Sequence, residues 1–304
     1  MRPRFLGVFL VLCFALVAQS QKVPSGAILV KGAEPSASDS VTPVPEAGSV
    51  ATNVYENRYF GLSYRLPADW TTGFDGPPPS DSGSYVLAQL EPADTFKGPD
   101  KGTILITAQD LFFAHSASSA MDLIKYTRDK LPSYYEVERP PAEVKIANRV
   151  FARFDYMSRA AGLHWYVLAT EIRCHAVQFV FSSRDAGMLE KFIGDLNTMK
   201  LPGGQESPVC VRDYAATETN VVRQVDPILS DHKFNPIPVR IIIGTDGRVK
   251  HVHVISGFRE QAAGITEAVM QWKFKPYVRN GKPVEVETGI MFGTDPRHRG
   301  SPSG

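Results

Sequence analysis

Apolar and polar positions alternate along several short stretches in the first two thirds of the chain. Phe60, Leu62, Tyr64 and Leu66 are separated by polar or small residues. A period of two is typical of a strand with one buried face. Similar runs follow at residues 85–90, 103–110, 149–157, 163–171 and 175–181. Together these runs predict an antiparallel sheet.

Two other stretches repeat their apolar residues at helical spacing. The first follows a cap at Ser118 or Ser119, and its apolar face comprises Ala120, Leu123, Ile124 and Leu131. The second lies within residues 185–199, with the apolar face Leu189, Phe192, Ile193 and Leu196. The order of three strands, a helix, three strands and a helix predicts an α+β domain, with helices packed on an antiparallel sheet.

A second, smaller pattern follows Cys210. Alternating positions at 239–243 run into Asp246-Gly247, which is typical of a hairpin, and a strand at 248–255 returns. We predict a helix capped by Ser256, with the apolar face Ile265, Ala268, Val269 and Trp272. Asn280-Gly281 marks another tight turn before a last strand at 283–292.

The length of 304 residues favours two domains. Residues 33–51 are rich in Ser, Pro, Ala and Gly and show no apolar period, which is typical of disorder. We therefore predict a disordered linker at 21–52, a domain at 53–201, a linker at 202–212, a domain at 213–293 and a disordered tail at 294–304.

The first 20 residues have the features of an export signal. Arg2 and Arg4 precede an apolar run at residues 5–18, and small residues allow cleavage near Ser20 and Gln21. An uncleaved anchor is the alternative, but crossing a bilayer takes about 20 apolar residues. We therefore expect an exported protein that is periplasmic or associated with the outer membrane.

Charge and cysteine content narrow the possible ligands. Lys plus Arg number 33 against 32 Asp plus Glu, so no basic excess favours nucleic acid. Cys174 and Cys210 are left after the signal, and they form either a disulfide or two separate thiols. Neither a CxxC pair nor a Cys/His cluster with zinc spacing is present, so we predict no metal and no cofactor.

Candidate catalytic groups are sparse. His251 and His253 share one face of a strand and form at most a two-histidine metal site; we interpret them as solvent-facing, with Val252 and Val254 on the core side. His115-Ser116 lacks the GxSxG context of a nucleophile. We therefore expect no enzymatic activity and no catalytic residue.

The first domain shows a resemblance carried by residues 55–70, YENRYFGLSYRLPADW. A tyrosine-rich first strand followed by Pro and Trp resembles the start of the PsbP/Mog1-like domains. The resemblance covers residues 53–201 and implies their fold for this part of the chain.

The second domain resembles the C-terminal domain of the TonB family. The resemblance is carried by PVRIIIGTDGRV at 238–249, AVMQWKFKP at 268–276 and NGKPV at 280–284. It implies a small α/β sandwich that binds an extended peptide of an envelope or outer-membrane protein by strand addition. The strand that matches the partner-binding edge comprises Glu285, Val286, Glu287, Thr288, Gly289, Ile290 and Met291.

The chain departs from the TonB pattern, since it has a short hydrophobic start and a globular domain in place of a long Pro-rich spacer. Our main hypothesis is a non-enzymatic envelope protein that binds through its C-terminal domain, with homodimers through exposed edges also allowed. One alternative is a periplasmic ligand-binding protein or hydrolase using a cleft of the first domain. Another is a membrane-anchored energy transducer.

Overall fold

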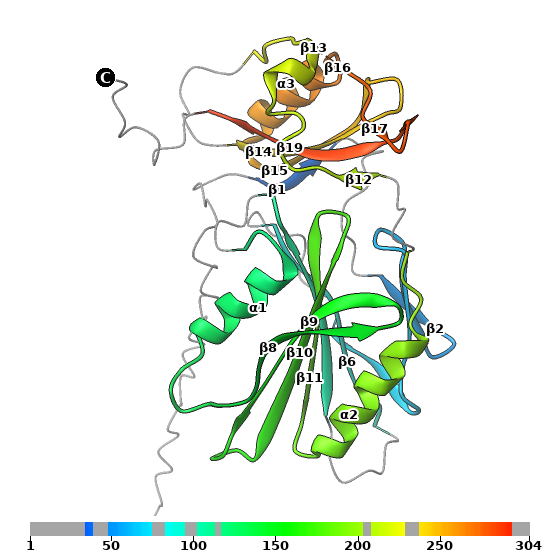
Figure 1. Ribbon diagram of the computed structural model, residues 1–304, viewed down its shortest axis with the longest axis vertical. Coiled ribbons are helices and arrows are strands. Elements are labelled where there is room, and N and C mark those ends of the chain that lie inside the picture. The colour runs from blue at the N-terminus through cyan, green and yellow to red at the C-terminus, as the bar shows by residue number, and fades with distance from the viewer. Residues whose placement is uncertain are drawn as a thin grey trace, which may run out of the picture.

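A computed structural model describes residues 34–38, 48–74, 83–94, 102–112, 117–202, 208–228 and 237–293. The expected signal at 1–20 and tail at 294–304 lie outside these residues. Two of the three clusters of buried apolar side chains belong to the N-terminal part and one to the C-terminal part. Figure 1 shows the two parts one above the other, with the C-terminal sheet lying across one end of the N-terminal strands.

A seven-stranded antiparallel sheet organises the N-terminal part, in the order β5-β6-β7-β11-β10-β9-β8. Its strands are β5 (Trp70–Phe74), β6 (Ser84–Pro92), β7 (Thr103–Asp110), β8 (Glu136–Ile146), β9 (Arg149–Ser158), β10 (Leu163–Ile172) and β11 (His175–Ser183). A smaller sheet shares its core and comprises β2 (Ser49–Ala51), β3 (Val54–Asn57) and β4 (Leu62–Arg65). This strand-rich α+β architecture agrees with the predicted class.

Two helices lie on opposite sides of the large sheet (Figure 1). Helix α1 (Ala120–Asp129) packs Ile124 in a cluster with side chains of β9, β10 and β11. Helix α2 (Ala186–Asp195) packs in the larger cluster on the other face. The side chain of Ser119 accepts a hydrogen bond from the Asp122 N–H at 3.0 Å, which caps α1 as predicted.

Strand β8 has no counterpart among the predicted strands. It contains Pro140 and Pro141, which lack a backbone donor and make a central strand improbable on sequence grounds. The structure places β8 at the end of the sheet, and its register against β9 shifts between Val137 and Arg139 and again between Arg139 and Ala142. Edge position and irregular pairing are the conditions under which a strand accommodates proline.

The C-terminal part contains a five-stranded sheet in the order β1-β15-β14-β19-β12, covered on one face by α3 (Arg259–Val269). Its strands are β1 (Glu34–Ser38), β12 (Val209–Cys210), β14 (Ile237–Ile243), β15 (Val249–Gly257) and β19 (Val286–Phe292). Short pairs are β13 (Val221–Arg223) with β16 (Lys273–Phe274) and β17 (Val278–Arg279) with β18 (Lys282–Pro283). Short 3-10 helices span Leu196–Thr198 and Glu218–Asn220.

Two turns form where the sequence predicts them. Gly247 has φ of +81°, and a Cβ there would lie 2.0 Å from the Phe274 carbonyl oxygen, so the turn requires glycine. Asn280 and Gly281 both have positive φ and connect β17 to β18. The expected helix cap is different, because β15 continues through Ser256 and the helix begins at Arg259.

The segment 21–52 is not disordered throughout, which corrects the linker prediction. Within it, β1 pairs antiparallel with β15, and Ala37 lies opposite Val254. Strand β2 pairs with β3 as well. Composition missed both strands because backbone pairing to an existing edge needs no apolar period in the added segment.

Candidate functional site

The strand predicted to bind a partner, residues 285–291, contains side chains of two kinds. Val286 is fully buried and belongs to the core under α3, whereas Glu287 is fully buried on the opposite face of the sheet. The strand pairs with β14 over its whole length, from Val286 opposite Ile243 to Phe292 opposite Ile237. Strand β19 is therefore an integral part of the sheet. A partner strand can pair only with the edge of β19 that lies opposite β14.

The first half of that other side is occupied by the chain itself, which corrects the prediction of an open edge along 285–291. Strand β12 runs parallel to β19, with the Val209 N–H donating to the Glu285 carbonyl at 2.8 Å. The Val211 N–H donates to the Glu287 carbonyl at 3.0 Å, and the Gly289 N–H donates to the Arg212 carbonyl at 3.4 Å.

The second half of β19 extends beyond β12. The backbone groups of residues 285, 287 and 289 point toward β12. Since backbone direction alternates along a strand, the N–H and C=O of Met291 point the same way. No described strand pairs with this side of β19 beyond Arg212, and Met291 is 37% exposed. The open edge is short and centred on Met291.

A disulfide joins Cys174 to Cys210 and links the two parts of the molecule. Cys174 lies in the turn between β10 and β11, where Arg173 and Cys174 both have positive φ. Cys210 lies in β12. The covalent link therefore holds β12 against the N-terminal part and, through β12, holds the covered half of β19.

A buried polar cluster fills the interface beside the disulfide. Arg240 of β14 donates through Nη1 to Asp110 at 2.6 Å, and its Nε lies 3.1 Å from Oε1 of Glu287. The Tyr59 hydroxyl donates to the same Glu287 oxygen at 3.2 Å, and Arg173 Nε lies 3.6 Å from Oε2. Two guanidinium groups thus face two carboxylates from the two parts of the chain.

Burial shifts the pKa values of two side chains in the cluster, Asp110 and His175. Burial raises the pKa of Asp110 to about 6, although Arg240 opposes this. Burial, with Arg240 as a second cause, lowers the pKa of His175 well below its usual value. Neutral His175 accepts from Arg240 Nη1 through Nε2 at 2.7 Å, so its Nδ1 donates to the Arg173 carbonyl at 2.6 Å.

The two strand histidines do not face solvent, which corrects their interpretation. His253 is 1% exposed on the interface side of the sheet, and burial lowers its pKa well below the usual value. His251 is half-buried. Val252 and Val254 pack under α3, as expected. The face opposite α3 is covered by the N-terminal part, which the alternation of residues does not reveal.

The remaining sequence candidates concern catalysis, metal binding and a membrane anchor. His115 and Ser116 lie outside the described residues. Within the described ranges, no group of three or more His, Cys, Asp or Glu side chains is placed to hold a metal ion. The helices of the described part are all too short or too polar to cross a membrane.

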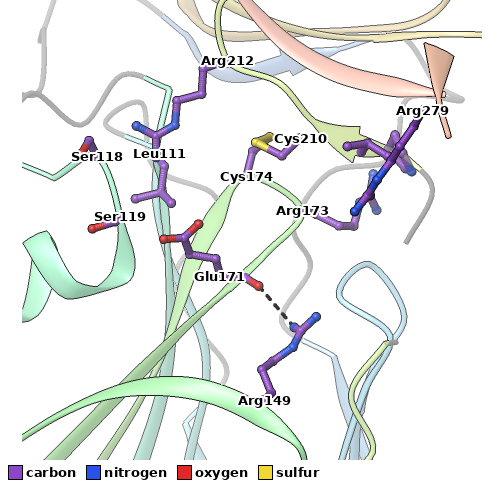
Figure 2. Close-up of a pocket in the computed structure, with 12 residues that line it drawn as sticks. Leu111, Ser118, Ser119, Arg149, Glu171, Arg173, Cys174, Cys210, Arg212 and Arg279 are labelled. Carbon is purple, nitrogen blue, oxygen red and sulfur yellow. Dashed lines mark hydrogen bonds between the residues drawn. A yellow bond between two sulfur atoms is a disulfide. The ribbon is translucent and has the colours of Figure 1, made fainter. Parts of the chain in front are cut away.

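A cavity of about 470 Å³ lies beside the disulfide, between the two parts of the chain. Its polar lining includes Arg149, Glu171, Arg173, Arg212 and Arg279. Figure 2 shows these side chains around one space, with Glu171 near its centre, Arg149 below it and Arg212 above it. Sequence reasoning did not identify this set, because its members are far apart along the chain.

Comparison with known proteins identifies the C-terminal part. Residues 236–294 match the family described as Gram-negative bacterial TonB protein C-terminal. The match starts later than the predicted domain at 213, although Tyr214 and Ala215 belong to the same core. No curated protein sequence is similar enough to the chain to count as a relative.

A solved structure of cyanobacterial PsbP (CyanoP) from Synechocystis sp. PCC 6803 is similar to the chain at 12% identity and a TM-score of 0.35. The match covers 51% of this chain and 96% of that one. PsbP is the family whose domains residues 53–201 resemble in sequence. Residues 236–294, by contrast, form a C-terminal domain of the TonB type, a kind of domain associated with the envelope of Gram-negative bacteria.

Proposed function

We propose that this chain is a non-enzymatic envelope protein whose TonB-type domain binds an extended segment of another envelope protein by strand addition. The observation that carries the proposal is the second half of β19, where the strand extends beyond β12. Unpaired backbone groups at a sheet edge supply hydrogen bonds to an added strand. The proposed contact is confined to residues 289–292.

The shape of the edge supports a short contact. The Gly289 N–H is engaged by the Arg212 carbonyl, so a partner strand starts where β12 ends. Ile290 and Phe292 pack against the C-terminal core, while Met291 is partly exposed on the other face. A partner segment therefore gains backbone pairing at Met291 and an apolar contact with its side chain.

The proposed location follows from the domain type and the first 20 residues. We infer export to the periplasm with cleavage near Ser20 and Gln21, so that the mature chain meets proteins of the outer membrane. Mass spectrometry of the mature N-terminus separates this from retention of an anchor, because cleavage removes the apolar run at residues 5–18.

The contact is tested by placing a photo-reactive amino acid at Met291 of the full-length chain in cells. We expect crosslinks to an extended segment of an envelope protein, identified by mass spectrometry. Val222, which is 57% exposed and lies in β13, is the control position. Crosslinks between copies of the chain would indicate homodimers through this edge. Identical crosslink patterns from both positions would refute the proposed site.

Backbone pairing is tested by proline at adjacent positions. Met291→Pro removes an outward donor, so we expect loss of partner binding with the domain folded. Met291→Ala keeps the donor and should retain most binding. Ile290→Pro removes a donor directed at β14, so it should lower the melting temperature. Retained binding in a folded Met291→Pro variant would show that the partner does not pair with this edge.

A further inference from the structure

Positive charge dominates the cavity beside the disulfide. Four arginines line it against a single carboxylate, that of Glu171, and one of the four, Arg173, also faces Glu287 of the buried polar cluster. Arg149 and Arg173 come from the N-terminal part, and Arg212 and Arg279 come from the C-terminal part. A cavity with walls of one charge sign concentrates ligands of the opposite sign.

The four arginines differ in the contacts that their side chains make within the protein. Arg149 donates to the carbonyls of Glu171 and Pro202, each at 3.2 Å, and these contacts fix its position. Arg173 donates to the Tyr59 carbonyl at 2.9 Å and lies 3.9 Å from the centre of the Tyr59 ring. These two guanidinium groups are therefore held in place before any ligand arrives.

Arg212 and Arg279 have no carboxylate within salt-bridge distance among the described residues. The backbone of Arg212 is fixed, because its carbonyl accepts from the Thr288 hydroxyl at 3.1 Å and from the Gly289 N–H at 3.4 Å. Arg279 lies in β17, next to the Asn280-Gly281 turn. Both side chains line the cavity (Figure 2), and Arg212 also acts at longer range on the buried Asp110, whose pKa burial raises and Arg212 helps to lower.

Glu171 is already engaged with a different group. Its Oε1 accepts from the Ala120 N–H at 3.0 Å, at the start of α1. A carboxylate at a helix N-terminus is stabilised by the unpaired N–H groups there. Its charge is therefore partly satisfied by α1, and the guanidinium groups of Arg212 and Arg279 are the ones left for an external anion.

We propose that this cavity binds an oxyanion with two or more negative charges, either a polycarboxylate or a phosphate compound, and that the ligand bridges the two parts of the chain. The planar guanidinium fork matches carboxylate and phosphate oxygens and forms charge-assisted hydrogen bonds with them. The volume of about 470 Å³ accommodates a ligand of several heavy atoms. This site is separate from the edge at Met291, and it stands or falls independently of strand addition.

Calorimetric titration of the full-length mature chain with citrate and with pyrophosphate tests the proposal. We expect at least one of them to bind the unmodified protein. Arg212→Gln combined with Arg279→Gln should weaken binding by about tenfold or more, because two charge-assisted contacts are lost. The control is Arg223→Gln combined with Arg248→Gln. Both arginines are exposed and lie in the C-terminal part, and this double substitution removes the same charge as the cavity pair.

The Glu171→Gln variant distinguishes a change in the binding site from misfolding of the protein. Glutamine keeps an oxygen for the Ala120 N–H and removes the carboxylate charge, so anion binding should tighten by about threefold or more. A gain in affinity does not arise from a damaged fold. Binding of citrate alone would indicate a carboxylate ligand, and binding of pyrophosphate alone a phosphate ligand.

Two results would overturn the anion site. One is the absence of binding by either probe to the unmodified protein at low ionic strength. The other is an equal loss of affinity in the cavity pair and the control pair, which would assign the binding to the general charge of the surface.

Discussion

The two faces of the TonB-type sheet are built from the same strands, but one is apolar and the other carries buried charged side chains. Val239, Ile241 and Ile243 of β14 lie under α3 in an apolar core. Arg240, between two of them, is equally buried, but it faces carboxylates of both parts of the chain. The apolar face accepts many arrangements of similar volume. The charged face accepts one, because each charge needs its partner at a defined place.

We therefore infer that the apolar face holds the domain together and the polar face selects its position against the N-terminal part. A buried ion pair contributes little to stability compared with well-packed apolar residues, yet it penalises every docking that leaves a charge unpaired. Three experiments sharpen or break this comparison.

The largest effect is expected from Arg240→Met. Loss of the guanidinium leaves Asp110 and Glu287 buried beside each other's charge, and the free energy of unfolding should fall by about 3–5 kcal/mol. Ile241→Val, the next residue along and on the apolar face, should cost about 0.5–1.5 kcal/mol. Urea denaturation measures both. Adding Asp110→Asn and Glu287→Gln to Arg240→Met should recover part of the loss. Equal costs for the two single variants would remove the distinction between the faces.

Removal of the disulfide comes next. The cysteines are 36 residues apart, so Cys174→Ser with Cys210→Ser should lower the stability by about 3–4 kcal/mol through the loop entropy of the unfolded chain. We expect the lost stability to weaken the docking of the two parts. Thermal denaturation should then show two separate transitions, where the unmodified chain shows one. Reductant should reproduce the effect in the unmodified chain and leave the double variant unchanged. A single transition in every case would mean that the polar cluster suffices to couple the two parts.

The smallest effect concerns pH. The folded chain lowers the pKa of His175 and of His253 through burial, so both contribute stability above about pH 6.5 that is lost as the pH falls. Asp110 acts in the opposite sense, because its pKa is raised to about 6 and its contribution is lost as the pH rises through that value. His253→Leu leaves the other two groups in place.

The difference between the unmodified chain and His253→Leu therefore isolates one histidine. Between pH 7.5 and 5.5 the variant should lose about 1.4 kcal/mol less stability. Denaturation curves at several pH values provide the measurement. Parallel pH profiles would show that His253 is hydrated in solution, contrary to its burial at the interface.

Sequence reasoning predicted most strands of the large sheet, the three helices and two of the turns because their signals are local. The cap at Ser119, for example, lies next to the helix that it starts. Pro140 and Pro141 concealed β8, since their tolerance depends on an edge position that only the tertiary fold defines. The two residues of β12 are too few for any period.

The site was harder to predict for a related physical reason. Alternation along β14 and β15 shows which residues share a face, but it does not show what covers that face. His253 was therefore interpreted as solvent-facing, whereas the structure buries both His253 and Arg240. The arginines of the cavity come from distant segments, and no sequence spacing connects Arg149 with Arg279.

The pairing of β12 with the last strand has a consequence for biosynthesis. Asp110 and His175 are made long before Arg240 and Glu287, so the nascent N-terminal part presents these groups to water until the rest of the chain emerges. Cys210 is held in place by β19, which is among the last segments to be translated. A chain truncated before residue 286 therefore lacks the strand that presents Cys210 to Cys174.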